Sequence, residues 1–341
     1  MFQFLSSLFA PTANRPSGVD DELIEAAIDR VIEGTDTRLK VLGGSRRQLR
    51  EPVETAVAHV IDLIGALPDP VEISSRTFGS DPRLHAFFAS VNHMKEKVGA
   101  AESVSAYLKQ TAVGGNTRLY GLLSMQWQQR NRLGTVLQDG RIQRDVQQTA
   151  VNFLNHNFVG PSVTGEEAVW NMKARAFDFI IEVALERITA AQTRYADLEK
   201  HQLLLKQKLK TMRAGNWGLE EVLRPESSGE KDFSALEVQI ETIERELAQI
   251  GARHEVLEKN LQIIKDTLAS AEELLALRSV EFELDSMNIT ADTSTAARTH
   301  KLELIEIYSS IGASRILLPG WFPLEDLPDD RAPIADAMRY L

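Results

Sequence analysis

A repeat of apolar residues at alternating steps of four and three constrains this fold more than any other feature. It occurs twice, from Phe177 to Met212 and from Leu236 to Leu275. Each stretch has one polar exception, Gln202 in the first and His254 in the second. An average period of 3.5 residues, held over about five heptads, is typical of a coiled coil. We therefore expect two long helices that each bury one apolar stripe.

The two stretches have similar lengths and are separated by residues that do not favour a helix. Thr164 and Glu167 have the spacing of a capping box, so the first helix is expected to begin just after them. Residues 214–232 contain several glycines and Pro225, which interrupt a continuous helix. These features predict an antiparallel coiled-coil hairpin over 165–278 with a tip loop at 214–232.

Further apolar residues lie outside the repeat, at the open end of the predicted hairpin. They include Ile180, Val183 and Leu185. Because a solvated stalk does not need them, we expect this end to pack against other parts of the protein. The exceptional His254 is expected to lie near Ala191, as a polar layer that the small alanine accommodates.

Strand-like alternation of apolar residues flanks the hairpin region on both sides. An Asp-Gly pair at 139–140 separates two such runs, which is typical of a tight β-hairpin. The expected strands are 133–137, 142–146, 149–158, 280–284, 302–307 and 316–318. We predict that they share one sheet, into which the coiled coil is inserted.

The remaining N-terminal part has a helical spacing of apolar residues. Ile24, Ala27, Ile28 and Val31 follow the pattern of one buried helix face, and similar stripes continue to Met125. The predicted fold class is mostly α (α+β). Its expected parts are an N-terminal segment and linker at 1–18, a helical region at 19–130, a β-containing head with a C-terminal helix at 131–164 and 279–341, and the coiled-coil hairpin at 165–278.

Composition and charge narrow the possible chemistry. The chain has 38 Lys and Arg residues against 49 Asp and Glu residues, a net charge of −11 at pH 7 that repels nucleic acid. It has no cysteine, which excludes disulfides, thiolate metal sites and cysteine nucleophiles. Phosphate-loop, dinucleotide-binding, zinc-protease and serine-hydrolase motifs are absent. We therefore expect no cofactor and no metal, and we interpret the protein as non-enzymatic.

The first ten residues form a candidate contact surface. At helical spacing the bulky apolar side chains occupy one side, and small polar ones occupy the other. The apolar contact residues are Phe2, Phe4, Leu5, Leu8 and Phe9. Such a helix is suited to a membrane interface or to docking onto a protein. No Lys or Arg precedes Arg15, which argues against a secretory signal and favours a cytoplasmic location.

Two other segments are candidate interaction sites. One is a basic patch without an intervening acid, made of Arg38, Lys40, Arg46, Arg47 and Arg50. It could meet anionic lipid or an acidic partner, or it could be an ordinary solvated surface. The other is the tip of the predicted stalk, with Trp217, Leu219, Val222 and Leu223, which could dock a partner or cap the last seam layer.

Together these features favour a non-enzymatic coiled-coil scaffold in the cytoplasm, held at the inner face of a membrane by its N-terminal helix. An alternative is a soluble adaptor subunit of a larger complex, in which that helix docks onto protein. A third alternative is an enzyme whose catalytic residues come together in the head. The expected partner is another protein or a second copy of this chain, with an anionic membrane surface as a further candidate.

Overall fold

The structure is a computed structural model that describes residues 21–111, 117–138, 141–213, 229–250, 255–292, 299–310, 312 and 314–327. These residues form two compact units. The first contains the described residues of 56–177 and 270–327 together with 21–23, and the second contains those of 24–55 and 178–269. Two helices, α3 (Ser45–Gly65) and α7 (Gly165–Arg213), contribute residues to both units.

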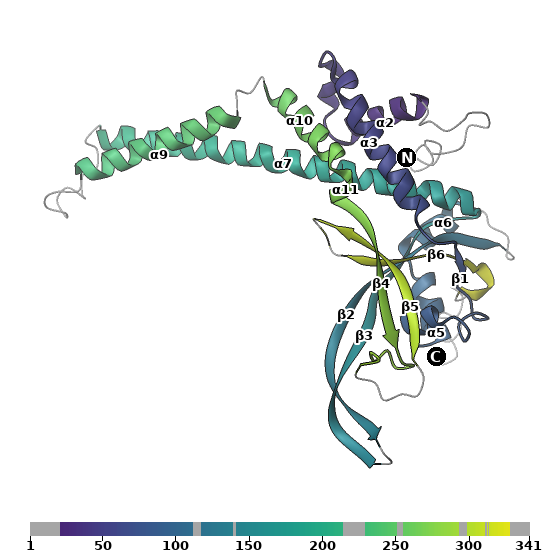
Figure 1. The fold of residues 1–341 in the computed structure, drawn as a ribbon. Coiled ribbons are helices and arrows are strands. Elements are labelled where there is room, and N and C mark those ends of the chain that lie inside the picture. The colour runs from purple at the N-terminus through teal and green to yellow at the C-terminus, as the bar shows by residue number, and fades with distance from the viewer. Residues whose placement is uncertain are drawn as a thin grey trace, which may run out of the picture. The chain divides into compact units, whose positions relative to one another are not determined.

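A six-stranded sheet forms the base of the first unit (Figure 1). Its strands are β1 (Val71–Glu72), β2 (Arg118–Gln138), β3 (Arg141–Ser162), β4 (Leu275–Leu284), β5 (His300–Ser309) and β6 (Arg315–Pro323). The order is β3-β2-β6-β5-β4 with antiparallel neighbours, and β1 joins β6 in parallel. The prediction that strands from both sides of the long helical segment share one sheet is therefore confirmed.

The strands β2 and β3 form a hairpin, as the Asp-Gly pair predicted, because Gln138 pairs with Arg141. The register between them shifts at three places. Each place contains a β3 residue with positive φ, namely Asp145, Asn155 or Gly160. An extra residue in one strand of an antiparallel pair bends that strand and increases its twist. These bulges account for the curl of the sheet in Figure 1.

The expectation that residues 19–130 are helical throughout is wrong for its last part, because 118–130 belong to β2. Leu119, Leu123 and Met125 alternate along the strand and pack in the core. Leu122, which points to the other face, is buried as well. Burial on both faces gives a nearly continuous apolar run, which fits a helical period as well as a strand.

Three short helices pack with the sheet: α4 (Pro82–Phe87), α5 (Val91–Gly99) and α6 (Glu102–Gln110). The side chain of Asp81 caps α4 by accepting a hydrogen bond from the Arg83 backbone N–H, and Ser90 caps α5 in the same way. One apolar core joins these helices to the strands, with Ile73, Leu84, Phe88, Met94, Leu119 and Phe158 among its largest members. The short elements α11 (Ala271–Leu274) and η3 (Leu324–Asp326) precede β4 and follow β6.

The second unit is helical. It contains parts of α2 (Asp21–Gly34), α3 and α7 together with η1 (Thr37–Val41), α9 (Gly229–Ile250) and α10 (Val256–Ala269). The apolar face predicted for the first helix is confirmed, since its residues are buried. Gly34 allows close packing on α7, because a Cβ atom there would lie 2.6 Å from Ile181 Cγ2. Nearby, Arg30 Nε donates to Asp178 Oδ1 at 2.9 Å.

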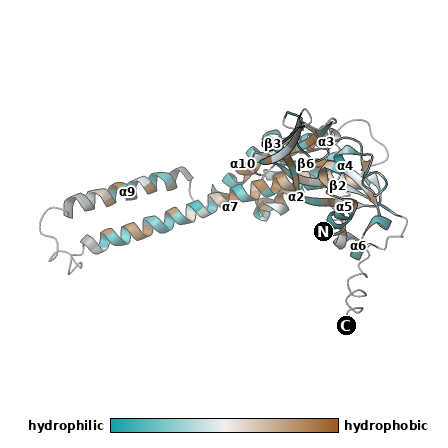
Figure 2. Ribbon diagram, turned by 90° about the horizontal axis from the view of Figure 1, so that it is seen from below, coloured by the Kyte–Doolittle hydropathy of each residue, from teal (hydrophilic) through white to brown (hydrophobic). Residues whose placement is uncertain are grey.

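The predicted long antiparallel coiled-coil hairpin is wrong. Its first arm is the single 49-residue helix α7, but the return segment contains the separate helices α9, of 22 residues, and α10, of 14 residues. α9 runs beside α7 (Figure 2), with Lys206 Nζ 2.8 Å from Glu244 Oε1. α10 also packs on η1, where the buried Asn260 donates to Asp36 Oδ2 at 2.8 Å. Leu275, the last expected position of the repeat, begins β4.

The physical reason is that a periodic stripe records burial of one helix face but not the element that covers it. In α10 the stripe residues Leu261, Ile264 and Leu268 are buried in a unit that also contains α2 and η1. In α7 the expected seam residues Leu198 and Leu205 are only half-buried. The α10 part of the second stripe is therefore buried in a globular helical unit, and the two stripes do not form one continuous two-helix seam.

Candidate functional site

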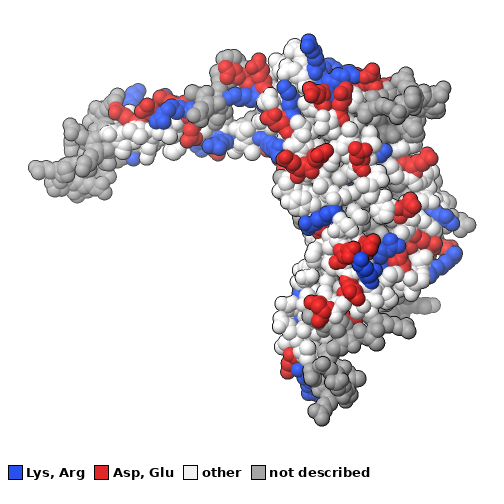
Figure 3. Space-filling model, viewed as in Figure 1, with Lys and Arg blue, Asp and Glu red and all other residues white. Residues whose placement is uncertain are grey.

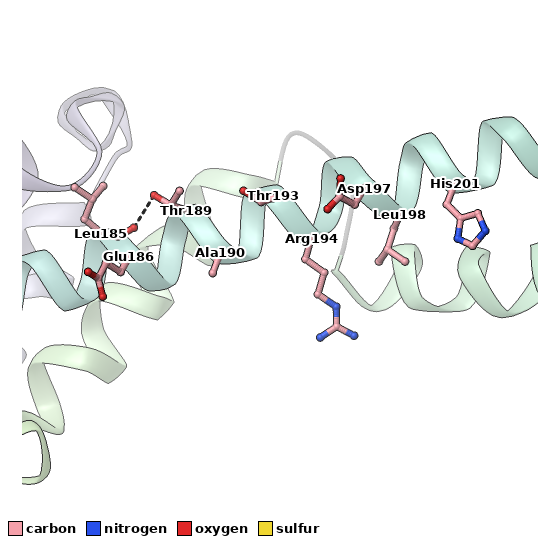
Figure 4. A pocket seen from close by; sticks show the side chains of 9 residues that line it. All are labelled: Leu185, Glu186, Thr189, Ala190, Thr193, Arg194, Asp197, Leu198 and His201. Carbon is pink, nitrogen blue, oxygen red and sulfur yellow. Dashed lines mark hydrogen bonds between the residues drawn. The ribbon is translucent and has the colours of Figure 1, made fainter. Parts of the chain in front are cut away.

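A shallow groove runs along one face of α7 in the second unit (Figure 4). Every residue that lines it belongs to α7: Leu185, Glu186, Thr189, Ala190, Thr193, Arg194, Asp197, Leu198 and His201. Leu198 is half-buried and the others are exposed. Leu185 retains 40 % of its accessible surface. The groove is thus a surface that α9 and α10 leave uncovered over its described residues.

Two ridges of side chains define the groove. Leu185, Thr189, Thr193 and Asp197 follow one another at steps of four, and the adjacent residues Glu186, Ala190, Arg194 and Leu198 form the parallel ridge. Between such ridges a helix surface accepts the ridge of another helix, with the two axes crossing at about −50°. The central residues Thr189, Ala190 and Thr193 are small, which allows a close approach of the two helices.

Charged groups flank the small centre of the groove. Glu186 and Arg194 lie one turn before and one turn after Ala190. Among the described residues, the guanidinium of Arg194 has one long ion-pair contact, 3.7 Å from Glu246. Thr189 Oγ1 donates to the Leu185 carbonyl at 2.8 Å, as the dashed line in Figure 4 shows. This hydroxyl therefore needs no further partner, and the groove has an uncharged centre between opposite charges.

The predicted basic patch does not form a free cationic surface. Arg38 pairs with Asp36 at 2.7 Å, and Lys40 pairs with Glu33 at 3.2 Å. Figure 3 shows blue and red side chains side by side over α2 and α3. Two further members are also paired, Arg46 with Glu25 and Asp29 and Arg50 with Glu25 and Glu54. Arg47 differs from them, because it is exposed and no ion pair with another described residue is found for it.

The other predicted contact residues lie outside the described residues. These are Phe2, Phe4, Leu5, Leu8 and Phe9 at the N-terminus, Trp217, Leu219, Val222 and Leu223 at the tip, and His254. The predicted C-terminal helix also lies outside them. Of the apolar residues expected to pack at the hairpin's open end, Ile180 and Val183 are buried, but Leu185 is not. That exposed leucine is the sequence signal that could have pointed to the groove.

His156 on β3 has the most perturbed environment among the histidines of the described chain. Its ring stacks on Phe88 at a centroid distance of 4.8 Å and lies 5.9 Å from the ring of His93. Burial, and then repulsion from His93, lower the pKa of His156 to about 4. The histidine is therefore neutral at physiological pH, and its stacking on Phe88 makes it part of the packing. Its buried Nε2 has no hydrogen-bond partner among the described residues.

The described residues contain neither a cluster of metal ligands nor a membrane-spanning helix. No group of three or more His, Cys, Asp or Glu side chains there is placed to hold a metal ion. No helix in that part of the chain combines the length and apolar character that crossing a bilayer requires.

Comparison with known proteins found no matching family model, no matching curated protein and no matching solved structure.

Proposed function

We propose that this protein is a cytoplasmic, non-enzymatic scaffold that self-assembles when the α7 groove binds the same groove of a second copy. The observation that supports this proposal is the charge arrangement around Ala190. Glu186 and Arg194 lie at equal distances on either side of this small residue, on one ridge of the groove. An arrangement with opposite charges about a centre is complementary to itself in the antiparallel orientation.

A two-fold axis through Ala190 gives a specific set of contacts. Each Arg194 lies beside Glu186 of the second copy, so the interface contains this pair twice. The two alanines meet at the crossing point, where small side chains allow the helix axes to approach closely. Leu185 loses the exposure that it has in the single chain, which supplies apolar burial.

The pairing of the basic patch with carboxylates also favours assembly over lipid attachment. Charge–charge attraction to anionic headgroups requires cations that are not already neutralised. Arg46 has two acidic neighbours, Glu25 at 3.0 Å and Asp29 at 2.5 Å. These ion pairs therefore favour a scaffold whose partner is a protein surface over one that is attached to a membrane.

The test is the molar mass of the full chain over a range of concentrations, measured by sedimentation equilibrium. Wild type is expected to dimerise, and Ala190→Arg is expected to abolish the dimer because it adds bulk and charge at the crossing point. Ala196→Arg is the matched control, since Ala196 is also exposed on α7 but does not line the groove. Circular dichroism checks that each variant remains helical.

Charge reversal adds a sharper criterion. Glu186→Arg and Arg194→Glu should each weaken the dimer about tenfold, as expected for close charge pairs that occur twice, and the double variant should restore it. A wild-type chain that is monomeric at every concentration contradicts self-assembly. If such a monomer binds the helix of another protein and Ala190→Arg prevents this, the adaptor function replaces the scaffold.

A further inference from the structure

A buried carboxylate interrupts the apolar series on β5 in the first unit. Leu302 and Leu304 pack in the core, but the next residue on the same face is Glu306, which is 1 % exposed. Burying a carboxylate costs free energy because its charge loses hydration, unless hydrogen bonds and an opposite charge compensate for the loss. A residue that breaks the local pattern at such a cost is expected where the protein has a functional requirement.

Both oxygens of this carboxylate are used. Trp127 Nε1 donates to Glu306 Oε1 at 2.8 Å, and Arg278 Nε donates to Oε2. Arg278 and Glu306 are direct cross-strand partners in the β4–β5 ladder, so the backbone register fixes their separation. Glu306 therefore holds the guanidinium in one orientation, and the Tyr308 ring, 5.4 Å from Arg278 Cζ, supports it from the side.

The outer part of the guanidinium remains available. Arg278 is 54 % exposed, and its Nη1 and Nη2 atoms have no partner among the described residues. The hydrogen bond to Glu306, followed by its charge, raises the pKa of Arg278, so the side chain keeps its charge. The outward Nη1 and Nη2 groups form a two-donor fork, the geometry that binds a planar carboxylate by two parallel hydrogen bonds.

This fork opens on a pocket of about 350 Å³, a volume that suits a small organic molecule. Its lining residues are Gln126, Trp127, Gln128, Leu154, Arg278, Glu306 and Ser314. Asn155 Nδ2 donates to Gln126 Oε1 at 2.6 Å, which leaves the amide nitrogen of Gln126 as a donor. Trp127 and Leu154 supply apolar surface, and Ser314 supplies a hydroxyl group.

We propose that this pocket binds a small organic acid, whose carboxylate is held by the Nη1 and Nη2 atoms of Arg278. The apolar part of the acid packs on Trp127 and Leu154, and Gln126 donates to the second oxygen or to a polar substituent. Glu306 is a positioning residue. Its negative charge disfavours a phosphate dianion, so the site is matched to a monocarboxylate. This proposal does not depend on assembly through α7.

The test uses benzoate as the probe and the full-length chain as the receptor. Binding is measured by ligand-observed NMR at constant ionic strength, with neutral benzamide and inorganic phosphate as comparison probes. Benzoate is expected to bind saturably, and the two comparison probes are expected to bind much more weakly. Losing a charged hydrogen bond in Arg278→Gln should weaken benzoate binding about tenfold or more.

Two variants separate the site from general effects. Glu306→Gln keeps an acceptor for Trp127 but loses the charge that orients Arg278, so it should weaken benzoate binding less than Arg278→Gln does. Arg130→Gln is the matched control, because Arg130 is exposed on β2 and does not line the pocket. Equal binding of benzoate and benzamide, or unchanged binding by a folded Arg278→Gln protein, would overturn the proposal. Ala190→Arg should bind benzoate as wild type does.

Discussion

The β2–β3 hairpin and the α7–α9 pair are both long antiparallel arrangements, but they are held together differently. β2 and β3 pair through backbone hydrogen bonds from Tyr120 and Ser162 to Gln138 and Arg141. α7 and α9 satisfy their backbone hydrogen bonds internally, so only side chains connect them.

This difference bears on what the exposed side chains of each region do. Beyond Met125, β2 loses β6 as a neighbour, and the exposed residues that follow include Gln129 and Arg130. The cohesion of a backbone-paired ribbon does not depend on such side chains. Both regions also expose leucines, namely Leu133 and Leu154 on the ribbon and Leu185, Leu203 and Leu204 on α7. In the helical pair, apolar side chains are the type of group that holds the elements together, so where no described neighbour covers them a binding surface remains.

The largest expected effect tests the backbone-held region. A Cβ atom on Gly121 of β2 would lie 2.5 Å from Phe158 Cε1 and 2.9 Å from the Val159 carbonyl oxygen. The backbone oxygen cannot move away without disturbing the ladder, so Gly121→Ala should destabilise the fold by about 2 kcal/mol or more. Gly43→Ala is the control, because nothing lies within 4 Å of its Cβ position. Equal urea midpoints for the two variants would contradict this picture.

A smaller effect concerns His156, the buried histidine on β3. Its folded pKa of about 4 lies below the ordinary value of 6.5. Above pH 6.5 both states are neutral, and as the pH falls from 6.5 towards 4 only the unfolded chain takes up the proton. The free energy of unfolding should therefore fall by about 1–2 kcal/mol over this interval, allowing for partial solvent exposure of the ring. Urea titrations at several pH values measure this slope.

Substitution should remove that slope. His156→Gln is expected to flatten the stability profile between pH 6.5 and 4, whatever its effect at neutral pH. His300→Gln changes an exposed residue on β5 and serves as the control. A pH dependence that survives in His156→Gln would show that other titratable groups cause the slope.

The sheet was predictable where its signals are local. The Asp-Gly pair predicted a hairpin, and Gln138 pairs with Arg141 on either side of it. The alternation around Phe282, Leu304 and Leu317 predicted strands that lie in one sheet, as the structure shows. The error at Leu119–Met125 arose because burial on both faces removes the alternation. The helical hairpin failed for another reason, since the stripe residues of α10 are buried but α10 also packs on η1.

The candidate sites were harder to predict. The groove depends on which residues do not cover α7, and the pocket combines residues that are far apart in the sequence. The α7 groove exists because nothing among the described residues covers Ala190, and no property of Ala190 itself indicates this. The Arg278 pocket combines residues from β2, β3, β4 and β5, and Trp127 and Glu306 are 179 positions apart. Four of the five cations of the basic patch pair with acids, and three of those acids, Glu25, Asp29 and Glu33, lie on α2, outside the segment that contains the patch.

The smallest expected effect tests a purely side-chain contact between α2 and α3. Arg46 donates to Asp29 Oδ1 at 2.5 Å and to Glu25 Oε2 at 3.0 Å, and all three side chains are about half exposed. Exposed ion pairs contribute about 0–1 kcal/mol, so Arg46→Gln should cost less than about 1 kcal/mol. The exposed neighbour Arg47 supplies the control Arg47→Gln.

Salt and pH make this small effect diagnostic. The loss in Arg46→Gln should shrink as salt screens the charges, whereas the steric loss in Gly121→Ala should stay constant. The hydrogen bond from Arg46 lowers the pKa of Asp29, so its contribution is present above the ordinary carboxyl pKa and is lost as the pH falls through the lowered value. A salt-independent loss in Arg46→Gln would show that packing, and not charge, joins α2 to α3. The contrast between regions held by backbone hydrogen bonds and regions held by side chains would then remain, but ion pairs would no longer count among the contacts that join α2 to α3.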